Sequence, residues 1–103
     1  MDNLKTIDIQ AYEWFDKVNG NCYFAAIVTL NFGMSDQTEF RLPYQYGYWD
    51  HYIDMATQEL IKRDFIKLDH PHDALWIYCK DHNIILRTSK QKNCKKRDLK
   101  AII

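Results

Sequence analysis

The fold is decided by the stretch Trp14-Phe15-Asp16-Lys17-Val18-Asn19-Gly20-Asn21-Cys22-Tyr23, which predicts a β-hairpin. One apolar run stops at Asn19-Gly20, and another begins directly after it. Asn and Gly tolerate the positive φ angles of a tight primed turn, and the aromatic residues on both sides favour pleated strands. We therefore expect two antiparallel strands joined by a turn whose central residues are Asn19 and Gly20.

The residues on either side of this turn show the patterns of two different strands. Over residues 4–16, Ile7, Ile9 and Ala11 alternate with polar or aromatic neighbours, which predicts a strand with one apolar face. Residues 22–32 are apolar at both parities, as is typical of a strand that is covered on two sides. The second strand should therefore lie centrally in the sheet.

Two further strands and two helices follow along the chain. Residues 38–42 read as a third strand ended by Pro43, and residues 84–88 read as a fourth. Residues 49–66 predict the longer helix, because apolar side chains recur there at helical spacing. Its expected core-facing stripe comprises Trp49, Tyr52, Ile53, Ala56 and Leu60. Residues 73–82 predict a shorter helix, which Asn83 should terminate.

These elements together predict a single α+β domain over residues 1–89. Its sheet should have three to four strands, be mainly antiparallel, begin with the N-terminal β-hairpin and be packed by one long and one short helix. Residues 90–103 are expected to form a basic C-terminal segment with no more than a terminal turn.

The composition is that of a folded chain that is rich in aromatic residues. Hydrophobic residues make up 47% and charged residues 27% of the 103 residues, and Gly and Pro are scarce. No apolar run approaches the roughly 18 residues that span a bilayer, and residues 1–5 lack a signal-peptide pattern. We expect a cytoplasmic protein with no membrane partner. Three widely spaced cysteines predict reduced thiols rather than a disulfide framework.

The charge is distributed unevenly although the net charge is zero. Residues 1–86 carry 7 Lys or Arg and 13 Asp or Glu, whereas residues 87–103 carry 7 Lys or Arg and one Asp. An acidic body of net charge −6 therefore precedes a basic tail of net charge +6. Such an asymmetry bears on partners and solubility rather than on fold.

Three groups of side chains resemble catalytic or metal sites, and each has a simpler structural explanation. Asp50, His51 and Asp54 stand where capping and the helix dipole favour carboxylates. Cys79 and His82 are three residues apart on the shorter helix, but no glycine-rich oxyanion loop is near. The pair in His70-Pro71-His72 lacks a defined third ligand. We therefore predict no enzyme activity, no cofactor and no metal site.

The basic tail allows a nucleic-acid interaction as an alternative function. Its cations could pair with phosphates while Tyr12, Trp14 or Tyr23 stacks on bases. The candidate residues are Arg87, Lys90, Lys92, Lys95, Lys96, Arg97 and Lys100. We favour a solvated tail, or one that folds back onto the acidic body, because the charge of the body opposes a polyanion.

The densest aromatic group predicts a protein-binding surface. Aromatic anchors dominate interface hot spots, and nearby carboxylates would steer a basic partner. The candidate residues are Tyr44, Tyr46, Tyr48, Trp49, Asp50, Tyr52 and Asp54. Packing of the third strand against the first helix explains the same aromatic group equally well.

Three segments of the chain resemble a group of small uncharacterised bacteriophage and prophage proteins. They are Trp14-Phe15-Asp16-Lys17 with Gly20-Asn21 and Tyr23, Pro43-Tyr44-Gln45-Tyr46-Gly47-Tyr48, and Lys95-Lys96-Arg97-Asp98-Leu99. The sequence departs from the group's pattern at Cys22 and Trp49, where a small polar residue and Gly are expected. The resemblance carries no activity. It implies a viral or mobile-element protein that binds and blocks a host protein or complex, such as a defence or replication component, in a bacterial cytoplasm.

Overall fold

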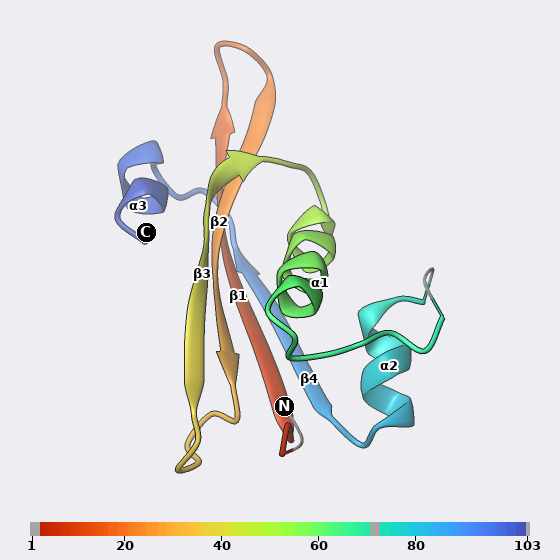
Figure 1. The fold of residues 1–103 in the computed structure, drawn as a ribbon. Helices are drawn as coiled ribbons and strands as arrows, with labels where there is room; N and C mark the ends of the chain where they lie inside the picture. The colour runs from red at the N-terminus through yellow and green to blue at the C-terminus, as the bar shows by residue number, and fades with distance from the viewer. Residues whose placement is uncertain (1–2, 71–72, 103) are drawn as a thin grey trace.

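The computed structural model describes residues 3–70 and 73–102, and they form a four-stranded mixed sheet with helices on both faces (Figure 1). The elements in chain order are β1 (Thr6–Asp16), β2 (Asn21–Leu30), β3 (Thr38–Tyr46), α1 (His51–Lys62), α2 (Leu75–Asp81), β4 (Ile85–Gln91) and α3 (Lys96–Lys100). The strand order is β3-β2-β1-β4. The predicted α+β class and the N-terminal hairpin are confirmed.

β1 lies between an antiparallel and a parallel neighbour. It pairs antiparallel with β2 from Ile7 opposite Leu30 to Asp16 opposite Asn21. It pairs parallel with β4, beginning with Thr6 opposite Ile85. β2 also pairs antiparallel with β3, so it occupies the central position that its apolar character predicted.

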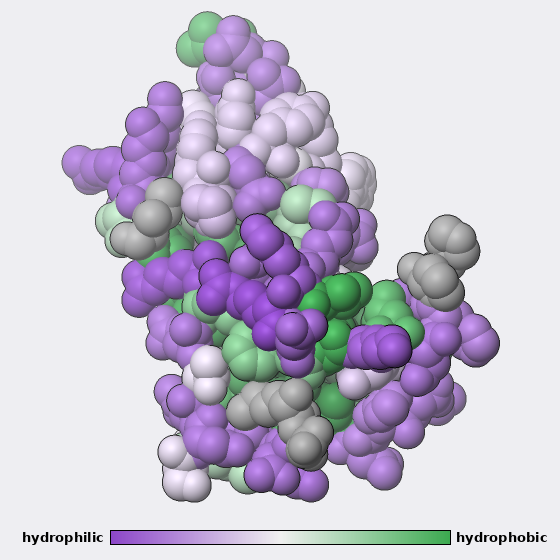
Figure 2. All heavy atoms as spheres, viewed as in Figure 1, coloured by the Kyte–Doolittle hydropathy of each residue, from purple (hydrophilic) through white to green (hydrophobic). Residues whose placement is uncertain are grey.

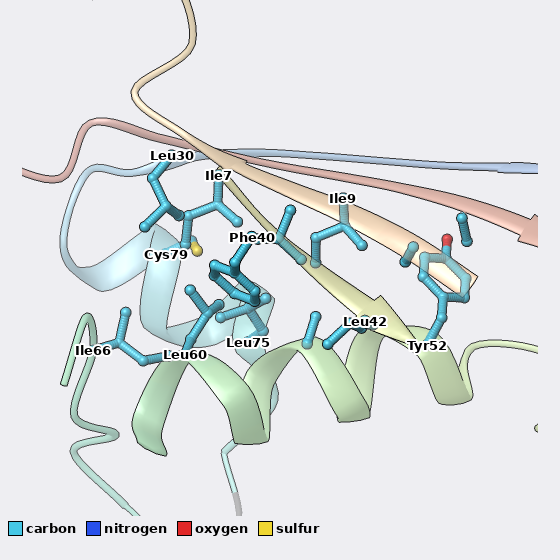
Figure 3. Packing of buried hydrophobic residues seen from close by; sticks show 14 of the residues in the cluster. Ile7, Ile9, Leu30, Phe40, Leu42, Tyr52, Leu60, Ile66, Leu75 and Cys79 are labelled. Atoms are coloured by element: carbon cyan, nitrogen blue, oxygen red, sulfur yellow. The ribbon is translucent and has the colours of Figure 1, made fainter. Parts of the chain in front are cut away.

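The main core lies between the sheet and the layer formed by α1 and α2 (Figure 3). The odd-numbered residues of β1 enter this core, with Ile7, Ile9 and Ala11 all buried. Tyr52, Ala56 and Leu60 of α1 meet them, so most of the predicted helical stripe is confirmed. Cys79 of α2 completes the cluster.

A second, smaller core lies on the other face of the sheet, where α3 packs. Leu99 and Ile102 are buried there against Ala25 of β2. The partly buried residues around them are Tyr12, Trp14, Tyr23, Ile27, Tyr44 and Cys94. The expected basic tail thus completes β4 up to Gln91 and then folds back onto the sheet as α3.

The hairpin is confirmed, but the predicted turn is wrong. Asp16 pairs with Asn21, so four residues, 17–20, form the loop. Gly20 has a φ of 71° and its N–H donates to the Asp16 carbonyl at 2.8 Å, whereas Asn19 does not adopt positive φ. The Asp16 carboxylate accepts bonds from the backbone N–H groups of Val18 and Asn19 and from the Asn19 side chain. These bonds stabilise a wider loop and lower the pKa of Asp16.

The predicted bounds of two other elements are also wrong. β3 continues past Pro43 to Tyr46. Proline has no N–H to donate, but the register shift opposite β2 occurs at this point, so the strand pairing does not require a hydrogen bond from Pro43. α1 begins at His51, two residues after the predicted start, and Trp49 lies outside the helix. α1 ends at Lys62 because Asp64 takes a φ of 61°. The N–H of the following residue, Phe65, then donates to the Leu60 carbonyl and caps the C-terminus of the helix. Asn83, with a φ of 56°, ends α2 as predicted.

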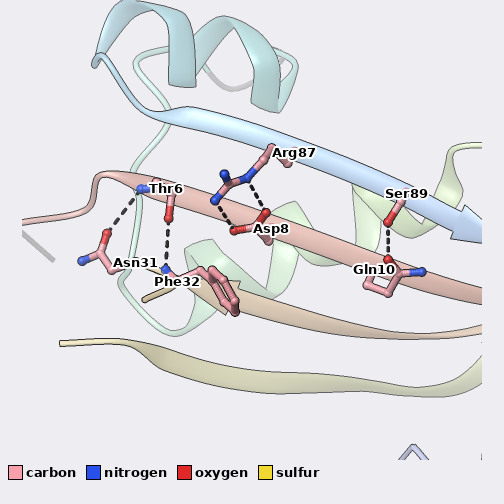
Figure 4. A network of polar contacts seen from close by, with 7 residues as sticks. All are labelled: Thr6, Asp8, Gln10, Asn31, Phe32, Arg87 and Ser89. Atoms are coloured by element: carbon pink, nitrogen blue, oxygen red, sulfur yellow. Dashed lines mark hydrogen bonds and ion pairs between the residues drawn. The ribbon is translucent and has the colours of Figure 1, made fainter. Parts of the chain in front are cut away.

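Asn31 ties the end of β2 to the start of β1 (Figure 4). It is fully buried, with a φ of 53°. Its side-chain oxygen accepts from the N–H groups of Lys5 at 2.6 Å and Thr6 at 3.3 Å, and its amide donates to the Asn3 carbonyl at 2.9 Å. Asn is suited to this position because it tolerates left-handed backbone and both donates and accepts.

Replacing Asn31 should therefore be costly. We expect Asn31→Ala to lower the free energy of unfolding by about 2–4 kcal/mol, because it leaves buried N–H and C=O groups unpaired and strains the backbone. Asn31→Gly, which loses the same hydrogen bonds but adopts the positive φ without strain, should be about 1 kcal/mol more stable than Asn31→Ala. Urea unfolding measures both values, and a loss below about 1 kcal/mol for Asn31→Ala would contradict this role.

Candidate functional site

The last residue of β3 and the segment between β3 and α1 carry aromatic side chains beneath the tip of the hairpin. We call Tyr46, Tyr48 and Trp49 the hairpin-end platform. The Tyr46 and Tyr48 rings meet edge to face at 5.3 Å, and the Tyr48 hydroxyl donates to the Gly20 carbonyl at 3.1 Å. In Figure 2 a broad pale region, the colour of intermediate hydropathy that tyrosine and tryptophan share, lies below the tip. The hydrogen bond from Tyr48 to Gly20 joins the platform to the hairpin loop.

Trp49 is presented to solvent by a strained backbone. Its φ is 53°, and 83% of the residue is exposed. For a residue with a bulky side chain this conformation costs about 1–2 kcal/mol relative to right-handed backbone. Glycine, the residue expected at this position from the resemblance, would adopt it without strain. Neither packing nor backbone preference within the chain therefore accounts for tryptophan here.

Close packing fixes the start of this segment. A Cβ on Gly47 would lie 2.6 Å from Cε1 of Phe24 and 2.7 Å from Cδ2 of His51, so a larger residue does not fit. The Gly47 N–H donates to the Cys22 carbonyl at 3.1 Å, and the His51 N–H donates to the Tyr48 carbonyl at 2.9 Å. These contacts hold both ends of the segment against β2 and α1.

A half-buried ion pair holds the middle of the segment between β3 and α1. Lys90 Nζ donates to Glu13 Oε2 at 3.0 Å and to the Trp49 carbonyl at 2.8 Å. Both charged side chains are 15% exposed, and the Lys90 ammonium lies 5.7 Å from the centre of the Tyr52 ring. Lys90 therefore connects β1, β4 and the strained residue of the platform.

An open depression lies beside this ion pair, with a volume of about 360 Å³. It is lined by Glu13, Cys22, Tyr48, Trp49, Lys90 and Lys92. Burial and the nearby Glu13 carboxylate raise the pKa of the Cys22 thiol, so it stays protonated at neutral pH. The depression thus offers an aromatic wall, charged groups and a protonated thiol.

The predicted protein-binding residues divide among three environments. Tyr46, Tyr48 and Trp49 form the platform. Asp50 and Asp54, both exposed, follow it in the sequence as the N-cap of α1 and a residue of its first turn. Tyr52 is 5% exposed and belongs to the main core (Figure 3). Tyr44 lies on the α3 face, where its ring stacks on Tyr23 at 5.1 Å.

Two of the predicted nucleic-acid-binding cations are engaged within the sheet. Arg87 donates to both carboxylate oxygens of Asp8, at 2.6 and 2.9 Å (Figure 4). Lys90 is paired with Glu13. The other candidates are exposed, and they are Lys92, Lys95, Lys96, Arg97 and Lys100.

The side chains considered for catalysis do not converge. Cys79 is buried in the core, which raises its pKa to about 11, whereas His82 is exposed and lies 2.9 Å from an Asp69 oxygen. His51 packs edge-on against Phe24 rather than joining its neighbouring carboxylates. His72 lies outside the described residues. Among residues 3–70 and 73–102, no three His, Cys, Asp or Glu side chains gather as metal ligands.

The described helices are all too short or too polar to cross a bilayer.

Sequence reasoning missed the Glu13–Lys90 pair and two exposed residues, Phe15 and Val18, at the hairpin tip. A signal for the pair was available. Glu13 has the same parity as the buried residues Ile9 and Ala11 of β1, so it interrupts the apolar face with a charge. A charge at such a position needs a partner from a neighbouring strand.

Comparison with protein-family models finds no match, and comparisons with curated proteins and with solved structures find none either.

Backbone strain at Trp49 can be measured without a partner. We expect Trp49→Gly to be more stable to urea than Trp49→Ala by about 1 kcal/mol, because both remove the indole and glycine alone accepts the positive φ. The same pair of substitutions at Trp76, an exposed residue of α2, should give the opposite order because glycine destabilises a helix. Equal stability of the two Trp49 variants would disprove the strain.

The ion pair should behave as a coupled unit. We expect Lys90→Met to lower the free energy of unfolding by about 2 kcal/mol, because it leaves the Glu13 carboxylate half-buried and unpaired, and partial exposure moderates the cost. Adding Glu13→Gln should restore most of the loss. Urea denaturation of both single variants and the double variant gives the coupling energy, and purely additive effects would argue against the pair.

Proposed function

We propose that this protein acts by stoichiometric binding to another protein and that the hairpin-end platform is its contact surface. The observation that carries the proposal is Trp49, which is 83% exposed on a backbone that disfavours it. Strained residues cluster at functional sites, and exposed tryptophan is enriched among interface hot spots. A partner that buries the indole would provide the compensation that the isolated chain lacks.

The platform is held in place before any partner arrives. Tyr48 is bonded to the hairpin loop, the Trp49 carbonyl is bonded to Lys90, and Gly47 is wedged against Phe24. A preorganised surface loses little conformational entropy on binding, and tyrosine and tryptophan provide large contact areas with few rotatable bonds. The tethered segment therefore favours a specific, tight contact.

Charges beside the platform favour a partner with a basic rim. Asp50 follows Trp49 directly as the N-cap residue of α1, Asp54 lies in the first turn of the helix, and both are exposed. Carboxylates at an interface rim raise the association rate of a positively charged partner. An apolar pocket that accepts the indole, surrounded by Lys or Arg, would complement this surface.

The resemblance to bacteriophage and prophage proteins provides the biological setting of the proposal. In that setting the partner is a host protein or complex, and binding inhibits a defence or replication component in the bacterial cytoplasm. Blocking of this kind requires no catalysis, cofactor or metal.

A binding experiment tests the proposal in two stages. Affinity purification from a bacterial host, repeated after nuclease treatment, identifies proteins retained without nucleic acid. The dissociation constant of the retained partner is then measured by calorimetry for the wild type and for Trp49→Ala, which should weaken binding by about 30-fold or more. Tyr46→Ala combined with Tyr48→Ala should also weaken it.

A matched tryptophan provides the control. Trp76 of α2 is 60% exposed and lies away from the platform, so Trp76→Ala should leave the affinity unchanged. Unchanged affinity of folded Trp49→Ala, or equal losses for the two tryptophan variants, would show that the platform is not the contact surface.

A further inference from the structure

We propose that the chain carries a second binding surface, on the outer side of α3, that takes the phosphate backbone of a nucleic acid. This basic α3 surface comprises Lys92, Lys95, Lys96, Arg97 and Lys100. Lys92 also lines the depression beside Trp49, whereas the other four residues are separate from the hairpin-end platform. The inference does not depend on the protein partner proposed above.

The cations of this surface are not neutralised by carboxylates. Within the part of the chain that the structure describes, none of the five forms an ion pair. Two carboxylates lie near them. The Asp98 carboxylate accepts the Lys95 N–H at 3.0 Å, and the Asp16 carboxylate is occupied by the hairpin loop. A positive field therefore remains at the surface.

α3 is docked with its apolar side against the sheet, while its basic residues stay exposed. Leu99 and Ile102 are buried, and the Ile102 carbonyl accepts from Arg41 Nη1 at 2.5 Å. The Cys94 N–H donates to the Glu13 carbonyl at 2.9 Å, which fixes the chain just before the helix. The cations thus project from a held element rather than from a loose tail.

The acidic part of the protein lies on the opposite face. Residues 50–81, which include α1 and α2, carry seven Asp or Glu and four Lys or Arg, and the sheet separates them from α3 (Figure 1). Interactions between solvent-exposed charges that are farther apart than the Debye length, about 8 Å at physiological salt, are largely screened by ions in the solvent. Because these carboxylates lie on the other side of the sheet, they oppose a polyanion at α3 only weakly.

The distribution of apolar side chains favours a nucleic acid over a membrane or a protein. A helix that binds a bilayer inserts apolar side chains beside its cations, whereas Leu99 and Ile102 point inward. Lysine is depleted from protein interfaces, yet four of the five cations are lysines. Phosphates are the ligands that such a set of unpaired charges suits.

The aromatic residues beneath α3 predict contact with the backbone rather than with bases. The Tyr23 ring stacks on Trp14 at 5.5 Å and on Tyr44 at 5.1 Å. The ammonium groups of Lys96 and Lys100 lie over Trp14 and Tyr44, at 5.7 and 5.9 Å. Because the rings contact one another and the two lysines, base stacking would require α3 to leave the sheet. We therefore expect little dependence on base sequence.

Fluorescence anisotropy with a labelled DNA duplex of about 20 base pairs tests this inference between about 50 and 200 mM salt. For the wild type we expect binding whose log–log salt slope is about −3, because each neutralised phosphate adds about 0.9. Lys95→Gln combined with Arg97→Gln should weaken binding about tenfold and flatten the slope by about 2. These two residues contact no ring, so α3 should stay docked.

Lys62→Gln combined with Lys67→Gln is the matched control, because it removes two exposed cations from the acidic side. It should leave duplex binding unchanged, as should Trp49→Ala, which separates this inference from the proposed function. Absence of binding at low salt, equal effects of the two double variants, or a strong preference for one base sequence would overturn it. Binding of anionic vesicles that Lys95→Gln with Arg97→Gln abolishes, without duplex binding, would assign the surface to membranes and also overturn it.

Discussion

β1 is paired along both edges, and this constraint decides which side chain faces which layer of the molecule. Because strand side chains alternate, the antiparallel register with β2 and the parallel register with β4 send Ile7 and Ile9 toward α1 and α2 and send Tyr12 and Trp14 toward α3. A slip by one residue would exchange the two sets. The two faces of the sheet therefore carry different side chains because the register of β1 is fixed by both neighbouring strands.

The same parity leads from the sheet to the hairpin-end platform. Glu13 occupies a core-facing position of β1, so a carboxylate lies at the end of the apolar face. Lys90 of β4 neutralises it, and its ammonium also binds the Trp49 carbonyl. Strand pairing thus places the Glu13 carboxylate in a half-buried position, where it requires the Lys90 ammonium as a partner. Lys90 in turn holds the strained Trp49, whose side chain points outward. The exposed tryptophan is a consequence of the sheet as much as of its own loop.

Local patterns in the sequence predicted most of the fold, whereas side-chain hydrogen bonds, backbone conformation and packing between distant segments determined what they missed. Alternation identified β1, and helical spacing placed Tyr52, Ala56 and Leu60 in the core. The four-residue hairpin loop depends on the Asp16 side chain, and α1 starts late because Trp49 has a positive φ, neither of which periodicity records. The aromatic group was predicted as one surface, but three-dimensional packing places Tyr44, Tyr52 and Trp49 in three environments. A tail that folds back onto the body was one of the alternatives, but a helix docked on the sheet was not predicted, because the apolar residues Leu99 and Ile102 follow a run of lysines.

The parallel pairing of β4 with β1 sets the order in which the chain can mature. β1, β2 and β3 are joined by short loops, whereas Asp8 and Arg87 are 79 residues apart in sequence. Contacts between residues so far apart in sequence form slowly, because the chain loses the entropy of loop closure before the contacts stabilise it. Until β4 has been synthesised and has inserted, one edge of β1 offers its backbone to any other extended chain. The Arg87–Asp8 and Lys90–Glu13 ion pairs then favour the correct register of β4, because both pairs form together only when β4 is aligned with β1 in this register.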